Sequence, residues 1–448
     1  MKSSLRTINH QSALVPWFIL GFLLLAGIVL RFVFIRDMEF KGDEYTLTVM
    51  AYRNVFGPYW AQVANQSSVG IPNPPFFVYL MSFPVLYSLS PVFLTLWIAL
   101  LNVLGIVILF LVLRKIFTSL MALEITAVVA SAPWAIVFSR KIWTPDALFP
   151  FFALFLYFLV SHASHKRAWK IVLLFLLLAL LAQLHMSAWF LPLPLLIFVA
   201  GNRPRLHWEL AWPLALGLFC ALIIWLPYLL ALSHDGFASV RDFLASRGGG
   251  SWSIQNLFWA FRITGTQGFE YLLGPGMQKF SRPLILGISQ WMSVVYQVIT
   301  VVGFFFLLWH LSLRTRFFSR IDRVESWEKL LSLLFLIFMV IQVCYILFHI
   351  PAFPHYNVIF YPFLALLFVT FLRQIVEKKF PVFRSFNSLL IIAVILANLT
   401  FSYSFLLLVH RNPEVIKGDY GVPYRLQAAE WEQQLQEELH LIRVDKGK

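Results

Sequence analysis

The chain has 448 residues, of which 60% are hydrophobic and only 12% are charged, and its formal net charge is +14. Because a soluble domain carries about 25% charged residues, this chain has too few charges to cover the surface of a water-soluble globule. The composition excludes a cytosolic enzyme, a nucleic-acid-binding protein and a disordered chain, and it predicts an all-α polytopic membrane protein.

Apolar runs of the length that a bilayer requires, roughly 20 helical residues, follow one another along the chain. About eleven spans are predicted, near residues 13–35, 92–113, 119–138, 146–161, 169–184, 187–200, 210–232, 283–312, 329–349, 356–373 and 387–409. The first run follows a short basic head without a small-residue cleavage site, which predicts a retained signal-anchor.

Lys and Arg gather in alternate connecting segments, and this asymmetry predicts a cytoplasmic N-terminus and a periplasmic C-terminus. The outer side then carries two long loops, about 36–91 and 233–282. We expect one transmembrane domain over 1–410 and a short extracytoplasmic amphipathic tail over 411–448. Since the mass outside the membrane lies on the outer side, the working site is expected there.

Two adjacent carboxylates, Asp43 and Glu44, follow the first span in the stretch FKGDEY. Partial desolvation at a membrane surface raises the pKa of a carboxylate toward neutrality, which suits a base, a metal ligand or a charge relay. A Gly-Asp-Glu sequence also commonly opens a helix, so a solvated loop with a helix cap is the alternative.

A short outer turn between two spans holds Arg140, Lys141 and Asp146. An ionisable group at a membrane boundary is a functional candidate. The structural alternative is a helix start, in which Thr144 caps, Pro145 takes the first position and Asp146 offsets the helix dipole.

Later candidates are His185, between two apolar runs, and His355 with Tyr356, at the start of a late span. A hydrogen-bonded structural His and an interfacial aromatic belt are the respective alternatives. The loop 233–282 adds a glycine-rich stretch, SRGGGSW, and the cations Arg262 and Arg282, which suit an anionic ligand such as a lipid-linked phosphate. A flexible solvated loop is the alternative and explains these residues almost as well.

The order of these features resembles the GT-C superfamily of membrane glycosyltransferases, in the branch of the protein O-mannosyltransferases and the lipid A aminoarabinose transferase. In that branch an Asp-Glu pair, here Asp43-Glu44, follows the first helix, and a proline-containing stretch, here Asn73-Pro74-Pro75, leads to the next helices. A later outer turn presents an Asp, here Asp146, and a late helix begins with a polar or aromatic motif, here His355-Tyr356.

The resemblance implies a GT-C-like fold with periplasmic juxtamembrane helices, in a bacterial inner membrane. It implies inverting transfer of a sugar from a polyprenyl-phosphate donor to a lipid, glycan or protein acceptor on the periplasmic face. Asp43 would be the base, and Glu44 and Asp146 would orient Asp43 or the acceptor. The candidates for the donor phosphate and substrate are Arg140, Lys141, His185, Arg262, Arg282, His355 and Tyr356. The three carboxylates would also suit Mg²⁺ or Mn²⁺, although no spacing demands a metal.

Two departures from the branch leave the acceptor open. The chain has Gln183-Leu184-His185-Met186 where the aminoarabinose transferase has Thr-Lys-Gly, and it lacks the large lumenal domain of the mannosyltransferases. The competing class is a carrier, such as a lipid-linked sugar flippase or transporter. Carriers tend to show paired repeat halves and ionisable groups near the bilayer midplane, whereas the acids here lie in outer loops and at span ends, which favours an enzyme.

Overall fold

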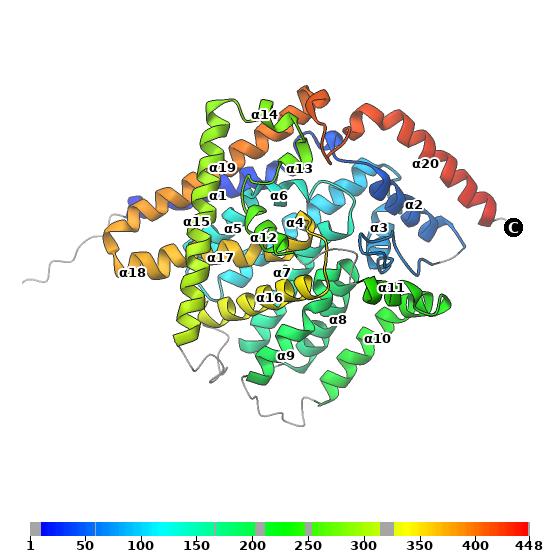
Figure 1. Ribbon diagram of the computed structural model, residues 1–448, viewed down its shortest axis with the longest axis horizontal. Coiled ribbons are helices and arrows are strands. Elements are labelled where there is room, and N and C mark those ends of the chain that lie inside the picture. Colours follow the sequence, from blue (N-terminus) through cyan, green and yellow to red (C-terminus); the bar gives the residue numbers. More distant parts are fainter. Residues whose placement is uncertain are drawn as a thin grey trace, which may run out of the picture.

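The computed structural model describes residues 10–58, 60–164, 167–201, 211–246, 253–313 and 327–446. Within these ranges the chain is all-helical, apart from loops and two isolated β-bridges (Figure 1). Residues 247–252, which hold the glycine-rich stretch of the predicted outer loop, lie outside the described residues.

The α-helices are α1 (His10–Val29), α2 (Gly42–Phe56), α3 (Phe76–Val85), α4 (Pro91–Leu113), α5 (Ser119–Ser131), α6 (Pro133–Val137), α7 (Leu148–Ser164), α8 (Ala168–Leu184), α9 (Pro192–Gly201), α10 (Ala211–His234), α11 (Ala238–Ser246), α12 (Gln255–Arg262), α13 (Glu270–Leu273), α14 (Gly276–Phe280), α15 (Leu284–Leu313), α16 (Trp327–Leu347), α17 (Tyr361–Thr370), α18 (Glu377–Lys379), α19 (Arg384–Arg411) and α20 (Tyr424–Lys446). Short 3₁₀ or π turns connect some of them: η1 (Ile35–Asp37), η2 (Thr144–Ala147), η3 (Met186–Phe190), η6 (Pro354–Phe360), η7 (Phe371–Val376), η8 (Pro381–Phe383) and η9 (Pro413–Val415).

Seven helical segments of the described chain are long and apolar enough to cross a membrane: Pro91–Leu113, Thr144–Ser161, Ala211–His234, Leu284–Trp309, Trp327–Leu347, Pro354–Lys379 and Pro381–Arg411. Five apolar helices are shorter: Val15–Val29, Phe76–Val85, Ser119–Ser131, Ala168–Leu184 and Met186–Ala200. The chain is thus a multi-pass membrane protein. The expected helical class is confirmed, and of the about eleven expected spans seven meet the length and composition of a full crossing.

Local breaks explain why some expected spans are shorter. The predicted span 119–138 is divided at Pro133, because proline lacks the backbone N–H that an uninterrupted helix needs. The first helix ends at Val29 rather than near residue 35, and Phe34 then adopts a left-handed backbone with φ of 51°. The chain therefore turns before it reaches Asp43.

The centre of the bundle is α5, whose residues from Met121 onward are all buried. It contacts α1, α4, α17 and α19, while α4 packs along α7 and α8 along α10. Glycines allow two of these close approaches. A Cβ on Gly105 of α4 would lie 2.8 Å from the Pro150 Cα of α7, and one on Gly27 of α1 would lie 2.8 Å from the Ala130 carbonyl oxygen of α5.

Gly105→Val is expected to lower the free energy of unfolding by about 1–3 kcal/mol, because the added carbons meet backbone that cannot move aside. Thermal unfolding in detergent measures the change. Gly21→Val in α1 is the control, since no atom lies within 4 Å of a Cβ built at Gly21. Equal losses in the two variants would contradict the packing argument.

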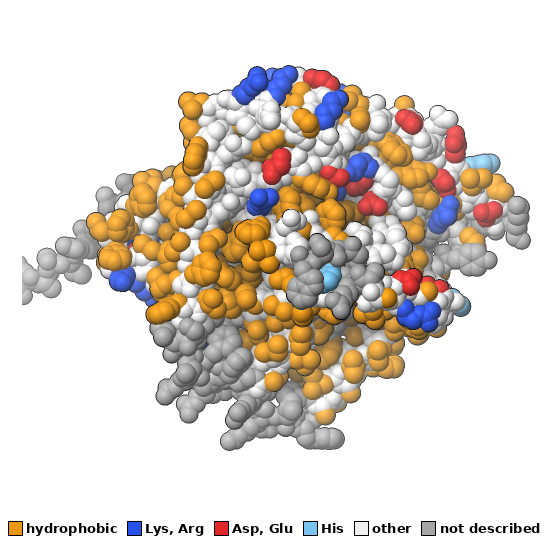
Figure 2. All heavy atoms as spheres, viewed as in Figure 1, with side chains coloured by type: hydrophobic (Ala, Val, Ile, Leu, Met, Phe, Trp, Pro, Cys, Tyr) orange, Lys and Arg blue, Asp and Glu red, His pale blue; other side chains and the backbone are white. Residues whose placement is uncertain are grey.

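Apolar side chains cover the broad face formed by α10, α15 and α16, and charged side chains gather near α13, α14 and α20 (Figure 2). Large exposed apolar residues on α10 and α15 include Phe219, Leu222, Ile223, Trp291, Val298 and Phe305. Exposed apolar surface of this extent is stable next to lipid but not next to water.

The C-terminal tail folds back over the end of the bundle. The predicted amphipathic helix is α20, which packs along α2 and buries Leu435, Leu439 and Ile442 on one face (Figure 1). Asp37 Oδ1 accepts from Arg425 Nε in the first turn of α20, and Asp37 Oδ2 contacts His410 Nδ1 at the end of α19, both at 2.6 Å. These contacts join the tail to the chain just before α2.

Candidate active site

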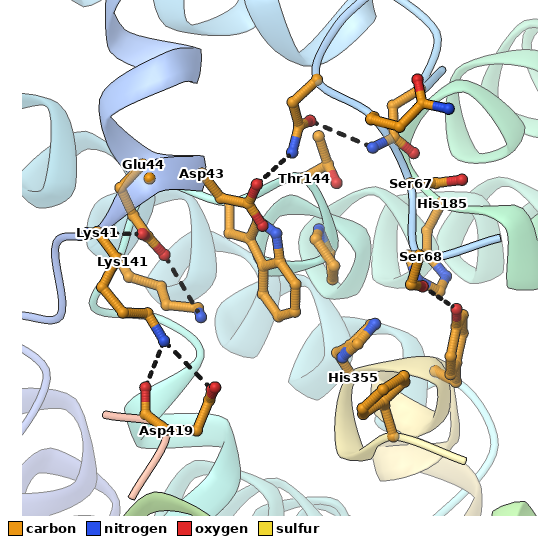
Figure 3. Close-up of a pocket in the computed structure, with 18 of the residues that line it drawn as sticks. Lys41, Asp43, Glu44, Ser67, Ser68, Lys141, Thr144, His185, His355 and Asp419 are labelled. Atoms are coloured by element: carbon orange, nitrogen blue, oxygen red, sulfur yellow. Dashed lines mark hydrogen bonds and ion pairs between the residues drawn. The ribbon is translucent and has the colours of Figure 1, made fainter. Parts of the chain in front are cut away.

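A cavity of about 290 Å³ opens beside the N-terminus of α2. Its lining comes from segments that are far apart in the sequence: Glu39 to Glu44, Asn65 to Ser68 with Asn73, Lys141 to Pro145, His185 and Met186, Tyr271, Phe353 to Tyr356, and Asp419. Polar side chains from these segments converge in Figure 3. The cavity therefore combines carboxylates, amines, amides and rings in one place.

Asp43 and Glu44 point in different directions, because consecutive residues of a helix project about 100° apart. The Asp43 side chain is exposed and lines the cavity, and its Oδ1 accepts a hydrogen bond of 3.1 Å from Asn65 Nδ2. Asn73 Nδ2 in turn donates to Asn65 Oδ1 at 3.2 Å. This chain of amides orients the Asp43 carboxylate toward the space (Figure 3).

Glu44 is buried and has a structural partner in its own helix start. Its Oε2 accepts the backbone N–H of Lys41 at 2.9 Å, and its Oε1 lies 3.5 Å from Lys141 Nζ. The helix-cap alternative therefore describes Glu44, whereas the neighbouring Asp43 faces the cavity.

Lys141 is enclosed by acids and an aromatic ring. Its Nζ lies 3.2 Å from Glu39 Oε1 and 3.9 Å from the centre of the Trp143 ring. Burial alone would lower the pKa of Lys141, but the carboxylates of Glu39 and Glu44 outweigh burial and raise it. Lys141 therefore stays protonated and compensates the buried carboxylates around it.

Lys41 is the more accessible of the two lysines in the cavity, with 35% of its side chain exposed against 6% for Lys141. Its Nζ lies 2.7 Å from Glu39 Oε1 and 3.3 Å from Asp419 Oδ2, and it also donates to the Asp419 carbonyl oxygen. Burial alone would lower the pKa of Lys41, but the Glu39 carboxylate outweighs burial and raises this pKa above its ordinary value. The cavity thus presents one reachable ammonium group.

Glu44→Gln is expected to remove a pH-dependent loss of stability. Burial raises the pKa of Glu44 to about 7, against the opposing charge of Lys141. A carboxyl with a raised folded-state pKa favours folding fully below its unfolded pKa and loses that contribution as pH rises through the folded pKa. The wild type should therefore lose up to about 3 kcal/mol between pH 4.5 and 7, and the Gln variant should lack this component. Melting temperatures across this range measure it, and parallel curves for the two proteins would contradict it.

The wall opposite Asp43 is made of rings and hydroxyls. His185 Nδ1 accepts the backbone N–H of Ser187 at 3.2 Å, which leaves the proton of the neutral ring on Nε2. The His355 ring lies 4.4 Å from that of Trp143 and 5.6 Å from that of His185, between centroids. The Tyr356 hydroxyl forms a hydrogen bond with Ser68 Oγ. Such a wall offers flat ring surfaces and a few hydrogen-bonding groups to a ligand in the cavity.

Four residues predicted for the site lie outside the lining. Asp146 is buried one residue beyond Pro145, and neither of its carboxylate oxygens has a hydrogen-bond partner among the described residues. The Arg140 guanidinium donates to three carbonyl oxygens after α1, those of Leu30, Val33 and Phe34. Arg262 is exposed and stacks on Trp259, and Arg282 is exposed as well.

Several polar residues of the lining were not candidates from the sequence, among them Glu39, Lys41, Asn65, Ser68 and Asp419, and Asn73 was named only as part of the Asn73-Pro74-Pro75 stretch. Glu39 and Lys41 stand beside the Asp-Glu pair, and that closeness was the available signal. Asp419 had none, because it lies 378 residues after its partner Lys41.

The carboxylates proposed for a divalent cation do not converge. Asp43 faces the cavity, Glu44 turns to Lys141, and Asp146 is buried outside the lining. Across the described ranges, no group of three or more His, Cys, Asp or Glu side chains is placed to hold a metal ion. These residues do not fit a Mg²⁺ or Mn²⁺ site.

No protein-family model matches the sequence, and no curated protein sequence matches it. Solved structures do. ArnT from Cupriavidus metallidurans in the apo state is similar with a TM-score of 0.54 at 15% identity, over 90% of this chain and 78% of ArnT. The same protein bound to undecaprenyl phosphate gives a TM-score of 0.50 at 16% identity, over 95% of this chain and 77% of ArnT. The Archaeoglobus fulgidus oligosaccharyltransferase in the apo form gives a TM-score of 0.48 at 14% identity, over 98% of this chain and 60% of the oligosaccharyltransferase. The likeness to ArnT shows a GT-C-like fold, as the order of the sequence motifs predicts.

Proposed function

We propose that the protein is an integral-membrane glycosyltransferase that moves a sugar from a polyprenyl-phosphate donor to an acceptor on the periplasmic face of a bacterial inner membrane. Two findings support the proposal: the GT-C-like fold, and the undecaprenyl phosphate bound in one ArnT structure. The observation that carries it is the meeting of an exposed carboxylate, Asp43, and a reachable ammonium, Lys41, in one cavity.

In the proposed reaction, an acceptor hydroxyl oxygen attacks the anomeric carbon of the donor sugar. The bond from that carbon to the phosphate oxygen breaks, and the phosphate leaves with the bonding electrons. The Asp43 carboxylate takes the hydroxyl proton, and Lys41 stabilises the negative charge that grows on the phosphate. Attack from the side opposite the leaving group inverts the anomeric configuration.

The other lining residues have supporting roles in this proposal. Asn65 and Asn73 orient Asp43, whereas Lys141 and Glu44 act at a distance by keeping the Lys41 backbone and Glu39 in place. His185, His355 and Tyr356 form the surface on which the sugar rests. Arg140, Arg262, Arg282 and Asp146 do not line the cavity, and the proposal gives them no direct part in the transfer.

Vesicles containing the purified protein test the proposal directly. They are supplied with a panel of polyprenyl-phosphate sugars and an envelope extract as acceptor, and free polyprenyl phosphate is followed by mass spectrometry. Release that depends on both protein and acceptor is expected. If the donor instead crosses the bilayer with its sugar still attached and no phosphate is released, the protein is a lipid-linked sugar carrier and the proposal is wrong.

A further inference from the structure

The ammonium of Lys41 already has an anionic partner inside the cavity. Asp419 Oδ2 lies 3.3 Å from Lys41 Nζ, and 43% of the Asp419 side chain is exposed. The second acid on Lys41, Glu39, is almost fully buried at 2% exposure and also binds Lys141. Of the two carboxylates on Lys41, that of Asp419 is the more exposed, and Figure 3 shows it beside the Lys41 ammonium.

The backbone that carries Asp419 is fixed against the end of α13. Asp419 N donates to Tyr271 O at 2.8 Å, and Lys417 N donates to Leu273 O at 3.1 Å. Between them, Gly418 packs so closely that a Cβ would lie 2.5 Å from Leu272 O. Rotation of the Asp419 side chain would therefore free Lys41 of the carboxylate without movement of the segment, while the Asp419 carbonyl oxygen keeps its hydrogen bond from Lys41.

A phosphate that binds Lys41 from the cavity competes with the Asp419 carboxylate, the more exposed of the two acids on Lys41. Lys41 already pairs with two carboxylates, so a phosphate would add a third anion and strong repulsion at the same ammonium. Glu39 cannot leave, because it is buried between two lysines. The anion from the ligand must therefore replace Asp419.

We propose that Asp419 is a resident counter-ion that exchanges with the donor phosphate at Lys41 and returns when the lipid product leaves. The inference rests on the proposed function. The donor is a phosphodiester with one negative charge, whereas the released polyprenyl phosphate is a monoester with about −1.5 to −2 at pH 7. Because Lys41 holds the product more strongly than the donor, competition from Asp419 matters most for product release.

Asp419→Asn tests the exchange through binding of a polyprenyl phosphate without sugar, measured with the full-length protein in detergent. Removal of the competing charge is expected to lower the Kd about threefold to fivefold, the range for a half-exposed ion pair. In the transfer reaction, both KM for the donor and kcat should fall, because donor binds more readily and product leaves more slowly. Asp419→Ser, which replaces the carboxylate by another small polar group, should change the Kd, KM and kcat in the same directions.

Two matched variants control for charge and fold. Glu414→Gln removes the same charge from an exposed position on the nearby turn η9 and should leave the Kd unchanged. Asp419→Glu keeps the carboxylate and should bind as the wild type does. If Glu414→Gln lowers the Kd as much as Asp419→Asn does, the cause is the overall negative charge of this region, and the exchange is wrong. Weaker binding by Asp419→Asn and Asp419→Ser would also overturn the exchange.

The outcomes also separate this inference from the proposed function. If the wild type binds the polyprenyl phosphate and both Asp419 variants bind with the same Kd, only the exchange is wrong. If the wild type and all variants fail to bind it while their unfolding curves remain cooperative, the donor class is wrong and the exchange falls with it.

Discussion

Asp43→Asn is expected to lower the rate of sugar transfer by about a hundredfold to ten-thousandfold, the usual contribution of a positioned base. Asn has nearly the shape of Asp and can still accept the hydrogen bond from Asn65, so the cavity should keep its geometry. The amide cannot take the acceptor proton. Single-turnover release of polyprenyl phosphate measures the rate, and the Kd of the donor should stay close to that of the wild type.

Asp242→Asn is the matched control for Asp43→Asn, because Asp242 is exposed on α11 and is absent from the cavity lining. It should transfer at the wild-type rate. A loss of less than about tenfold in Asp43→Asn would contradict the role of Asp43 as base. That result would indicate an acceptor already ionised at neutral pH, such as a phosphate, which Asp43 would only position.

Lys141→Met is expected to reduce the free energy of unfolding by about 3–5 kcal/mol at pH 8 and above, the cost of removing one partner of a buried ion pair. The Lys141 ammonium lies 3.2 Å from Glu39 and 3.5 Å from Glu44, and both carboxylates are buried. Met fills a similar volume but leaves these two negative charges facing one another. Thermal and denaturant unfolding in detergent measure the loss.

The cost of Lys141→Met should shrink as pH falls. Without the ammonium, the pKa of Glu44, already raised to about 7 by burial, moves higher still, so the carboxyl takes up a proton and the repulsion disappears. The destabilisation is therefore expected to be larger at pH 8 than at pH 5. Lys279→Met changes an exposed lysine on α14 and should have little effect at either pH. A pH-independent loss in Lys141→Met would assign it to packing rather than to charge.

The membrane helices were readable from the sequence because hydrophobic runs are local and a bilayer demands a minimum length. The expected span 92–113 corresponds to α4 (Pro91–Leu113), and 329–349 corresponds to α16 (Trp327–Leu347). Breaks caused by packing were less predictable. Pro133 was visible in the sequence, but whether it bends a span or divides it depends on the neighbours of α5 and α6.

The sequence also marked several residues that the fold brings into one cavity, among them Asp43, Lys141, His185 and His355. Residue chemistry alone could not separate Asp43 from Glu44, or Lys141 from Arg140, and only the family resemblance implied that Asp43 is the base. In each pair the residues are adjacent and of the same charge, and only the rotation of the segment within the bundle decides which one faces the cavity. Arg140 instead donates to backbone carbonyls that follow α1.

Composition and local order alone thus determined a multi-pass helical protein with an acidic pair at a helix start, because hydrophobicity and capping depend on near neighbours. Tertiary structure alone decided which charges meet. Lys41 and Asp419 lie 378 residues apart, and no local pattern links them. Their contact exists because backbone hydrogen bonds place the tail segment against α13, beside the cavity, and such long-range packing leaves no periodic signal in the chain.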